Sequence, residues 1–357
     1  MSGKESVKEY IWKQKPGTFP WMLQQAKPPL PKREISYAEN YRRTIVGEKP
    51  VWMPVHGAES DTCWPDVIEE HPVPEVDGPD YWGVEWQMEE TIGGMITRPG
   101  TRVIRDFDTW RDDVVWPDIE SLDWASDGEK ISSRFDPDRA HIYQCVEGIF
   151  ERLHEMMPFD ETLYAMAVEP ESSMEFFQKM ADYKIGLLGK VFDNYGRIDG
   201  VLYHDDWGHQ RSGFFSNEMF RELLMPPTKR VFDYIKGRGK HIELHSCGNN
   251  MQYLEEFIEL GVDMWSPQLG GVNDPVWLKE NYGDRISFSF PIPGLNEPGI
   301  DEATVRRRVR EFVDFYGKGG RMMATLWLGP DQAKVAEAAR DELYNYSKEY
   351  YASQSVS

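Results

Sequence analysis

The stretch HIELHSCGNNMQYLEEFIELGVDMWS, residues 241–266, predicts the fold most clearly. It starts with a strand pattern at 241–246, continues with a helical pattern at 250–260 and returns to an apolar strand at 262–266. A strand, a helix and a second strand in that order form a right-handed unit whose two strands run parallel. This stretch therefore predicts an α/β protein with a parallel sheet.

The same alternation extends along most of the chain. Further strand patterns lie at 50–55, 139–146, 199–204, 285–290 and 321–327. Helical patterns separate the later ones, and an eighth strand is expected at Tyr81–Trp86. This number of βα units favours a closed (β/α)8 TIM barrel over an open sheet.

The N-terminal part of the chain departs from this alternation. Residues 1–40 are predicted to form an N-terminal arm, because five prolines in KPGTFP and KPPLPKR disfavour helix and give extended backbone. A short helix is expected to begin near Ser36. Residues 57–137 are rich in Trp, Pro and Asp without periodicity, which is typical of insertions over an active face. We therefore expect the arm, 1–40, and one domain, 41–357.

Composition limits the classes of partner. The 357 residues include 40 Lys and Arg against 61 Asp and Glu, a net charge of −21. Such an acidic chain repels nucleic-acid phosphate and anionic lipid, so neither partner is expected. Three cysteines are too few and too far apart for a disulfide framework, which fits a reducing cytoplasm. No apolar run approaches the roughly 20 residues that span a bilayer.

In a barrel of this kind, catalytic residues lie at the C-terminal ends of the strands and in the loops that follow. Polar and aromatic residues recur at these positions. The residues expected to bind a substrate there are His56, Glu147, Trp207, Gln210 and Gln268. Among them, Trp207 is a candidate wall for an aromatic ring.

A possible metal site lies in ELHSCGNN. Glu243, His245 and Cys247 occupy alternating positions, so all three side chains are expected on one face of a strand. Imidazole and thiolate two residues apart suit zinc, although a buried structural His beside an inert Cys is the alternative. A catalytic zinc takes three protein ligands and keeps one open position. Asp331 is the candidate third ligand, with Asp206 and Glu147 as alternatives.

The segment YHDDWGHQ, residues 203–210, contains the candidate catalytic residues. His204, Asp205 and Asp206 could hold a proton or orient a metal ligand. The alternative is a turn with a helix cap, where Asp and Gly are common. Because neighbouring side chains on a strand point to opposite faces, only one of Asp205 and Asp206 is expected to enter the pocket.

These motifs resemble the uroporphyrinogen decarboxylase superfamily, and most closely its corrinoid-dependent methyltransferase branch. The resemblance covers residues 37–350 and implies a (β/α)8 barrel. The segments that carry it are ENYRRTIVGEKPVWMPV (39–55), DGVLYHDDWGHQRSGFFS (199–216), residues 241–268 and RMMATLWLGPD (321–331).

Two departures from the family pattern bear on the reaction. The decarboxylases continue their first strand with an arginine motif that grips substrate carboxylates, whereas this chain continues with MPVHGAES, which has no arginine. The resemblance therefore implies no porphyrinogen decarboxylation. The methyltransferase branch holds zinc with a His-x-Cys pair, matched by His245 and Cys247, and with a Cys after the last strand. Here that loop reads WLGPD, residues 327–331.

The nearest functional relatives implied by this resemblance are methyltransferases that demethylate aryl methyl ethers. The expected reaction moves a methyl group from a methoxylated aromatic compound to the Co(I) corrinoid of a separate carrier protein. Zinc on the ether oxygen, or a proton from His204 or Asp206, would assist the leaving group. Three alternatives stay open: a metal-assisted decarboxylase or lyase acting on a small aromatic acid, a methylcorrinoid-to-thiol methyltransferase, and a non-catalytic corrinoid-docking protein.

Overall fold

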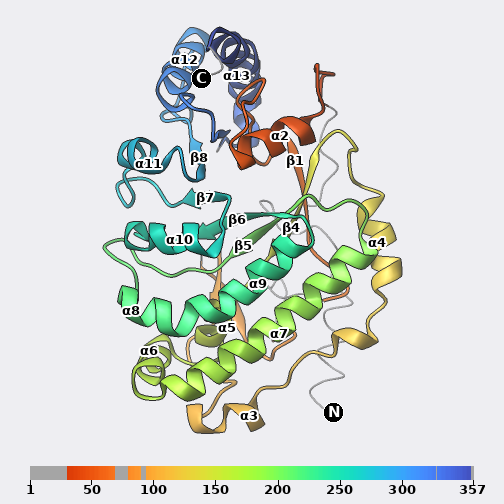
Figure 1. Ribbon diagram of the computed structural model, residues 1–357, viewed down its shortest axis with the longest axis vertical. Coiled ribbons are helices and arrows are strands. Elements are labelled where there is room, and N and C mark those ends of the chain that lie inside the picture. The colour runs from red at the N-terminus through yellow and green to blue at the C-terminus, as the bar shows by residue number, and fades with distance from the viewer. Residues whose placement is uncertain (1–29, 69–78, 90–93, 327, 355–357) are drawn as a thin grey trace.

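The computed structural model describes residues 30–68, 79–89, 94–326 and 328–354. Helices surround a curved parallel sheet of seven strands (Figure 1). In spatial order the strands are β1 (Ser60–Cys63), β4 (Ala140–Cys145), β5 (Gly200–His204), β6 (His241–Ser246), β7 (Met264–Pro267), β8 (Ser287–Pro291) and β9 (Met322–Thr325). Each strand runs parallel to its neighbours, which confirms the predicted α/β class.

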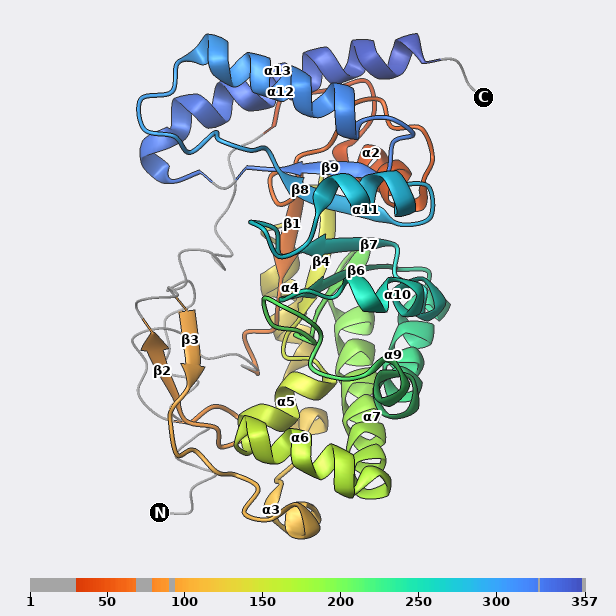
Figure 2. The ribbon, with the colours of Figure 1, turned by 90° about the vertical axis from the view of Figure 1, so that its left-hand side faces the viewer.

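The helices follow the strands in the alternating order that the sequence predicts. The principal ones are α2 (Tyr37–Val46), α4 (Trp124–Ser132), α5 (Ile149–Met156), α6 (Phe159–Val168), α7 (Pro170–Asn194), α9 (Met225–Gly237), α10 (Leu254–Leu260), α11 (Pro275–Tyr282), α12 (Glu302–Tyr316) and α13 (Ala333–Ser353). Helices α7 and α9 pack side by side along the sheet (Figure 1), and α12 packs on α13 beside β8 and β9 (Figure 2).

The helical segment that follows β5 is interrupted. Residues 217–238 form α8 (Asn217–Met219), a π-helical turn at Phe220–Leu224 and then α9. Pro226 and Pro227 lie at the start of α9. Proline has no N–H to donate to the preceding turn, so the regular α-helical hydrogen bonding cannot continue through this point.

The predicted first strand, 50–55, is reduced to a single bridge. Val55 pairs with Ala324 of β9, and the flanking backbone bonds join Ala324 N–H to Pro54 and His56 N–H to Ala324. A few residues later the chain becomes β1, which pairs with β4 on the other side of the sheet. Residues 54–63 therefore pair with the edge strand β9 at Val55 and then form the opposite edge strand, β1, but a complete eight-stranded barrel is not shown within the described residues.

The prediction of an eighth barrel strand at Tyr81–Trp86 is wrong. The carboxylate of Asp80 accepts the backbone N–H groups of Trp82 and Val84, so the segment folds into a turn instead of an extended strand. Trp86 then begins β2 (Trp86–Glu89), which pairs antiparallel with β3 (Gly94–Thr97). This hairpin lies apart from the main sheet (Figure 2).

The two faces of the curved sheet differ in character. Outward side chains such as Tyr203, Leu244 and Trp265 are buried against the helices. Inward side chains near the strand starts form a separate apolar cluster, in which Tyr41 and Ile45 of α2 pack among residues of β4, β7 and β9. Helix α2 therefore fills this end of the concave face, and the polar inward side chains lie at the other end.

The arm that was predicted at 1–40 is only partly within the described residues, because 1–29 lie outside them. Helix α2 begins at Tyr37, with the Ser36 hydroxyl accepting the Glu39 N–H as its cap, so the predicted helix start is confirmed. The single domain 41–357 stays a prediction. In the described part of the chain, every helix is too short or too polar to cross a membrane.

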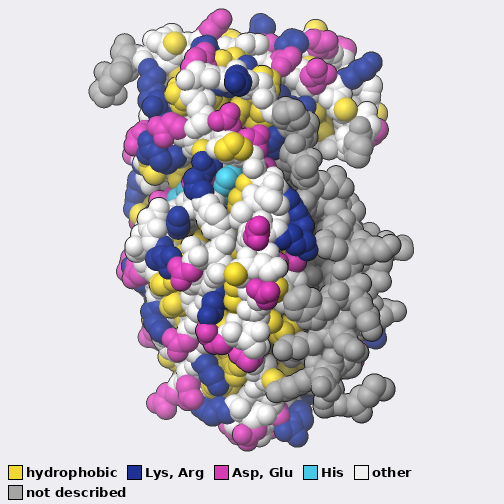
Figure 3. Space-filling model, turned by 90° about the vertical axis from the view of Figure 1, so that its right-hand side faces the viewer, with side chains coloured by type: hydrophobic (Ala, Val, Ile, Leu, Met, Phe, Trp, Pro, Cys, Tyr) yellow, Lys and Arg dark blue, Asp and Glu magenta, His cyan; other side chains and the backbone are white. Residues whose placement is uncertain are grey.

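Charges of both signs are interspersed on the molecular surface. On the face shown in Figure 3, Lys and Arg side chains lie among Asp and Glu side chains. Exposed pairs such as Arg230 with Asp182 and Arg238 with Asp193 belong to this pattern. Exposed pairs of this kind contribute about 0–1 kcal/mol each, so the stability of the fold depends mainly on its core.

Glu59, which precedes β1, is expected to make stability depend on pH. It is buried, and its Oε2 accepts the Trp52 Nε1–H at 3.0 Å. Burial raises the pKa of Glu59 from 4.5 to about 7. Between these values the folded protein binds the proton that the unfolded chain has released, so this contribution is present at low pH and is lost as the pH rises through about 7.

We therefore expect Glu59→Gln to flatten the pH dependence of unfolding. Between about pH 4 and pH 8, wild type should lose about 3 kcal/mol more than the variant, from ~1.4 kcal/mol per pKa unit. Urea unfolding at both pH values measures the difference. Parallel pH dependences in the two proteins would show that Glu59 ionises normally.

Candidate active site

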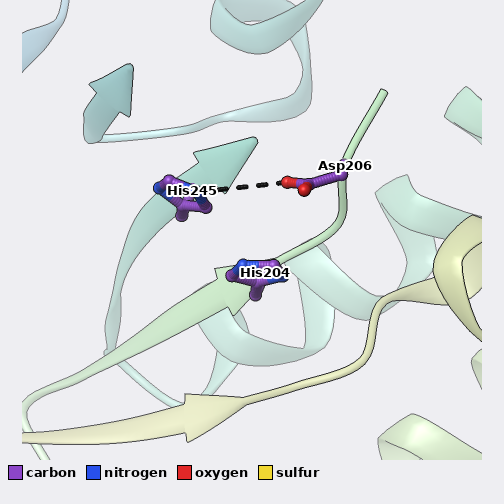
Figure 4. Close-up of side chains that lie close together, drawn as sticks. All are labelled: His204, Asp206 and His245. Atoms are coloured by element: carbon purple, nitrogen blue, oxygen red, sulfur yellow. Dashed lines mark ion pairs between the residues drawn. The ribbon is translucent and has the colours of Figure 1, made fainter. Parts of the chain in front are cut away.

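Two histidines face each other at the C-terminal ends of β5 and β6. His204 and His245 are register partners in the parallel ladder, so both side chains project from the same concave face. Their rings stack with centroids 4.7 Å apart and an angle of 24° between planes. Figure 4 shows these two rings and the carboxylate of Asp206 converging from the two strand ends.

The hydrogen bonds of His245 leave it suited to bind a metal. Its Nδ1 lies 3.1 Å from the carbonyl oxygen of Ser266, which can only accept, so Nδ1 carries the proton. The Nε2 lone pair then faces the Cys247 Sγ at 3.2 Å. Burial, reinforced by the nearby His204, lowers the pKa of His245 to about 4. The ring is therefore neutral at pH 7.

Asp205 and Asp206 divide between two environments, as strand alternation predicts. Asp206 is partly exposed, and its Oδ1 lies 4.0 Å from His245 Nε2 and accepts the Cys247 N–H at 2.5 Å. Asp205 is fully buried and accepts the N–H groups of Phe150 and Glu151, which caps the start of α5. Burial raises the pKa of Asp205 to about 7.

The donor set around His245 fits a zinc ion. Donor atoms of His204, Asp206 and His245 all lie within 4.8 Å of one another, and the Cys247 sulfur is adjacent. Tetrahedral zinc with bonds of ~2.0–2.3 Å separates its ligands by about 3.5 Å. The distances of 3.2 Å from His245 to Cys247 and 4.0 Å from His245 to Asp206 lie on either side of that value.

The electrostatics of Cys247 also favour a cation at this place. Burial and the neighbouring Asp206 carboxylate raise the pKa of the Cys247 thiol, so the thiol is protonated in the metal-free protein. A coordinating dication reverses this and deprotonates a thiol.

The carboxylate that lies beside the His245–Cys247 pair is that of Asp206. Asp331, the predicted third ligand, is exposed on the turn Pro330–Gln332 and belongs to neither described group of possible metal ligands.

A second group of donors shares His204. One donor atom each of Glu147, Glu151 and His204 also lie within 4.8 Å of one another. His204 Nδ1 lies 2.9 Å from Glu151 Oε2. Burial alone would lower the pKa of His204, but the carboxylates of Glu151 and Asp206 outweigh it and raise the pKa well above its ordinary value. Burial also raises the pKa of Glu151 well above its ordinary value, so His204 and Glu151 form a pair that holds a proton between them.

Close backbone contacts fix the loops that carry these residues. The N–H of Asn249, after β6, donates to the His209 carbonyl, after β5. Gly248 has a positive φ of 86°, and a Cβ there would lie 2.1 Å from the carbonyl carbon of Gly208. Its N–H donates to Gln268 Oε1 at 2.9 Å. Gly248 thus permits the two loops to touch and to hold Cys247 beside Asp206.

The other predicted substrate-binding residues have different surroundings. His56 is partly exposed and bonds to Glu243. Gln268 supports the loop after β6, and Gln210 is exposed in the loop after β5. Trp207 is fully buried and packs edge-on against Phe220, so it has no exposed surface with which to sandwich a ring, and its placement does not support the predicted role.

Sequence reasoning missed Glu151 and the surroundings of Glu243. Glu151 lies in the first turn of α5, where an acidic residue is typical of a helix start and does not by itself indicate a functional site. Its spacing of four residues after Glu147 is the one signal that could have placed both near one pocket. Glu243 was expected to share a face with His245, but its contacts with Tyr41 and His56 join segments far apart in the chain.

Comparison with known proteins identifies the family. The sequence pattern of the family named uroporphyrinogen decarboxylase (URO-D) matches residues 79–270, more than half of the chain. The chain therefore belongs to the uroporphyrinogen decarboxylase family. Among curated protein sequences, none matches it.

One solved structure supports the fold. A methyltransferase from Methanosarcina mazei is 14% identical, with a TM-score of 0.62 over 87% of this chain and 100% of that one. A sugar phosphate isomerase/epimerase from Parabacteroides distasonis is 13% identical, with a TM-score of 0.29 over 64% of this chain and 77% of that one. At these identities the likeness concerns the fold alone, and the second score is too low to support any argument.

Proposed function

We propose that the protein is a corrinoid-dependent methyltransferase. It takes the methyl group of a methoxylated aromatic compound and passes it to the Co(I) corrinoid of a separate carrier protein. The observation that carries this proposal is the convergence of His245, Cys247 and Asp206 beside the His204–Glu151 pair. Membership of the uroporphyrinogen decarboxylase family and the fold shared with the Methanosarcina mazei methyltransferase support it.

The reaction balances with one proton. The methyl carbon–oxygen bond breaks, and its electron pair stays on the aryloxide oxygen. Two electrons from Co(I) form the new cobalt–carbon bond, so the cobalt becomes Co(III) and the methyl group moves formally as a cation. The aryloxide then takes up a proton and leaves as a phenol. Because aryloxide is a poor leaving group from a neutral ether, the protein's contribution is to orient the ether and assist the oxygen.

His245, Cys247 and Asp206 are the residues that would hold zinc, with one position left for the substrate. When bound, zinc would supply Lewis acidity toward the ether oxygen. The chain's own residues prepare this site. The Ser266 carbonyl fixes the proton of His245 on Nδ1, and the Cys247 N–H holds the Asp206 carboxylate in place. Supporting contacts of this kind typically contribute 10- to 100-fold to metal affinity.

His204 is the residue proposed to hold the proton for the leaving oxygen. Its Nδ1 is hydrogen-bonded to Glu151, and its ring lies flat against that of His245. The hydrogen bond to Glu151 thereby keeps a proton on the His204 imidazole, next to the residues proposed to bind the ether oxygen. General acid assistance of this kind is worth typically ~10²–10⁴-fold.

The alternative of a decarboxylase or lyase acting on an aromatic acid is less favoured. A carboxylate substrate needs an unpaired cationic side chain, and among the described residues proposed for this site the histidine whose pKa is raised, His204, is already paired with Glu151. The site therefore suits a neutral ether better than an anionic acid.

Methyl transfer itself tests the proposal. We expect the purified protein, mixed with a reduced corrinoid carrier and a panel of methoxyphenols, to release the demethylated phenol and to convert the Co(I) absorption spectrum to that of methylcobalt. The same phenols without the methoxy group are the matched control and should leave the spectrum unchanged. If no methoxyarene in a broad panel is demethylated, the proposed donor class is wrong.

A further inference from the structure

A cavity lies at the end of the sheet where the strands begin, opposite the candidate active site. Its wall includes Ala140 and His241, the first residues of β4 and β6. Asp199 and Asp263, which directly precede β5 and β7, also line it, and one side of α2 closes it. The volume of about 560 Å³ lies within the range of ~300–1,000 Å³ that is typical of pockets for small molecules.

The carboxylates that line this cavity already have cationic partners. The pairs are Glu39 with Arg42, Asp199 with Arg197, and Asp263 with Lys236. Two of the carboxylates are also held by the backbone, because Asp199 accepts the His141 N–H and Asp263 accepts the Ile242 N–H, each at 2.8 Å. The protein's own contacts therefore offset the negative charge of the wall.

Lys240 is the cation of the wall that differs from the others. Its ammonium nitrogen lies 5.9 Å from the centroid of the Phe192 ring of α7, and among the described residues it has no hydrogen bond and no ion pair. Burial lowers the pKa of Lys240; Asp199 opposes this shift, and the guanidinium groups of Arg238 and Arg197 add to it. The ammonium is therefore partly desolvated beside other cations, without a carboxylate in contact.

The rest of the wall is largely apolar. It consists of Ala38, Val46, Ala140 and Ile198. Gly239, the neighbour of Lys240, also lines the cavity, and a Cβ there would meet nothing within 4 Å. There is thus open space beside the ammonium. A lysine ammonium is a point charge that binds phosphate or carboxylate, and an apolar wall favours a hydrocarbon body.

We propose that this cavity binds a small organic anion, whose single phosphate or carboxylate group pairs with Lys240 while its apolar body lies against α2 and the starts of β4 and β5. The site is separate from the candidate active site and does not depend on methyl transfer. Because the chain carries a net charge of −21, most of its surface repels an anion. The charge of Lys240 is what makes binding favourable at this place.

Phenyl phosphate, benzoate and the neutral benzyl alcohol are matched probes for calorimetry. We expect at least one of the two anions to bind, and the tighter of them identifies the preferred charged group. Benzyl alcohol should bind at least about tenfold more weakly than that anion, since hydrogen bonds between charged groups are the strong ones. Inorganic phosphate, which lacks the apolar body, should also bind more weakly than phenyl phosphate.

Lys240→Met removes the charge and keeps the length of the side chain. It should weaken binding of the preferred anion at least about tenfold. Lys179→Met is the matched control, because Lys179 Nζ also lies beside an aromatic ring, 4.7 Å from the Trp116 centroid, but does not line the cavity. This variant should bind the anion as tightly as wild type.

Acetylation of lysines, followed by mass spectrometry, locates the anion in the wild-type protein. The bound anion should protect Lys240 and leave the acetylation rate of Lys179 unchanged. The proposal would be overturned by an absence of binding for both anions, by equal affinity for benzyl alcohol, or by unchanged affinity in Lys240→Met. An anion that binds without protecting Lys240 would contradict it as well, and this measurement needs no variant to fold.

Discussion

Cys247→Ala is expected to lose almost all bound zinc and to reduce methyl transfer by about 10³-fold. The variant keeps His245 and Asp206 but lacks the soft ligand, and two protein ligands hold zinc poorly compared with three. Lewis-acid assistance is worth several kcal/mol, and each ~1.4 kcal/mol is tenfold in rate. Metal analysis of the purified protein and the initial rate with a methoxyphenol measure the two effects.

Cys63 provides the matched control for this substitution. It is a fully buried cysteine on β1, and its side chain belongs to the apolar core. Cys63→Ala should therefore lose some stability but keep about one equivalent of zinc. Equal metal content in the two variants would show that Cys247 is not a ligand.

Gly248→Ala is expected to disrupt the mouth of the site. A side chain at a φ of 86° is strained, at a cost of about 1–2 kcal/mol. The added Cβ would also meet the carbonyl carbon of Gly208 at 2.1 Å, and backbone atoms cannot move aside as a flexible side chain can. The loops after β5 and β6 must then separate. Because a misplacement of ~1 Å can cost about 10²-fold in rate, activity should fall by at least that factor.

The same substitution at Gly239 separates the backbone strain of a positive φ from the steric clash with Gly208. Its φ is 72°, but a Cβ there meets nothing within 4 Å. Gly239→Ala should therefore show the conformational cost alone, on the order of 1 kcal/mol, and should keep its activity. Urea unfolding and the rate of methyl transfer compare the variants. If both lost the same stability and Gly248→Ala stayed active, the contact between the loops would have no role.

The fold could be predicted where strands are apolar and helices periodic. Residues 241–266 show both patterns, so β6, α10 and β7 were found close to their observed limits. Strand β1, with the sequence SDTC, was missed because its side chains are mostly polar. Asp61 is accommodated there by Arg139 and by the N–H of Asp136, which lie more than 70 positions away. No local pattern could indicate those partners.

In the site, too, local patterns were predictable from the sequence and contacts between distant segments were not. The spacing of two residues placed His245 and Cys247 together, because strand periodicity is local. Choosing Asp206 over Asp331 as the nearby carboxylate depends on the register between β5 and β6, which only the packed sheet defines. Trp207 was predicted to line the pocket because it follows a strand, but its ring packs in the core beside Phe220. Position along the chain indicated the right end of the sheet, but not the direction of each side chain.

The central claim is that the imidazole of His245 and the sulfur of Cys247 bind one zinc ion together. X-ray absorption spectroscopy at the zinc edge tests this most directly on the purified protein. The account predicts a four-coordinate zinc with one sulfur at about 2.3 Å and the remaining ligands, nitrogen or oxygen, at about 2.0–2.2 Å. A zinc shell without sulfur, or a protein purified with no zinc that also fails to bind it when supplied, would contradict the account.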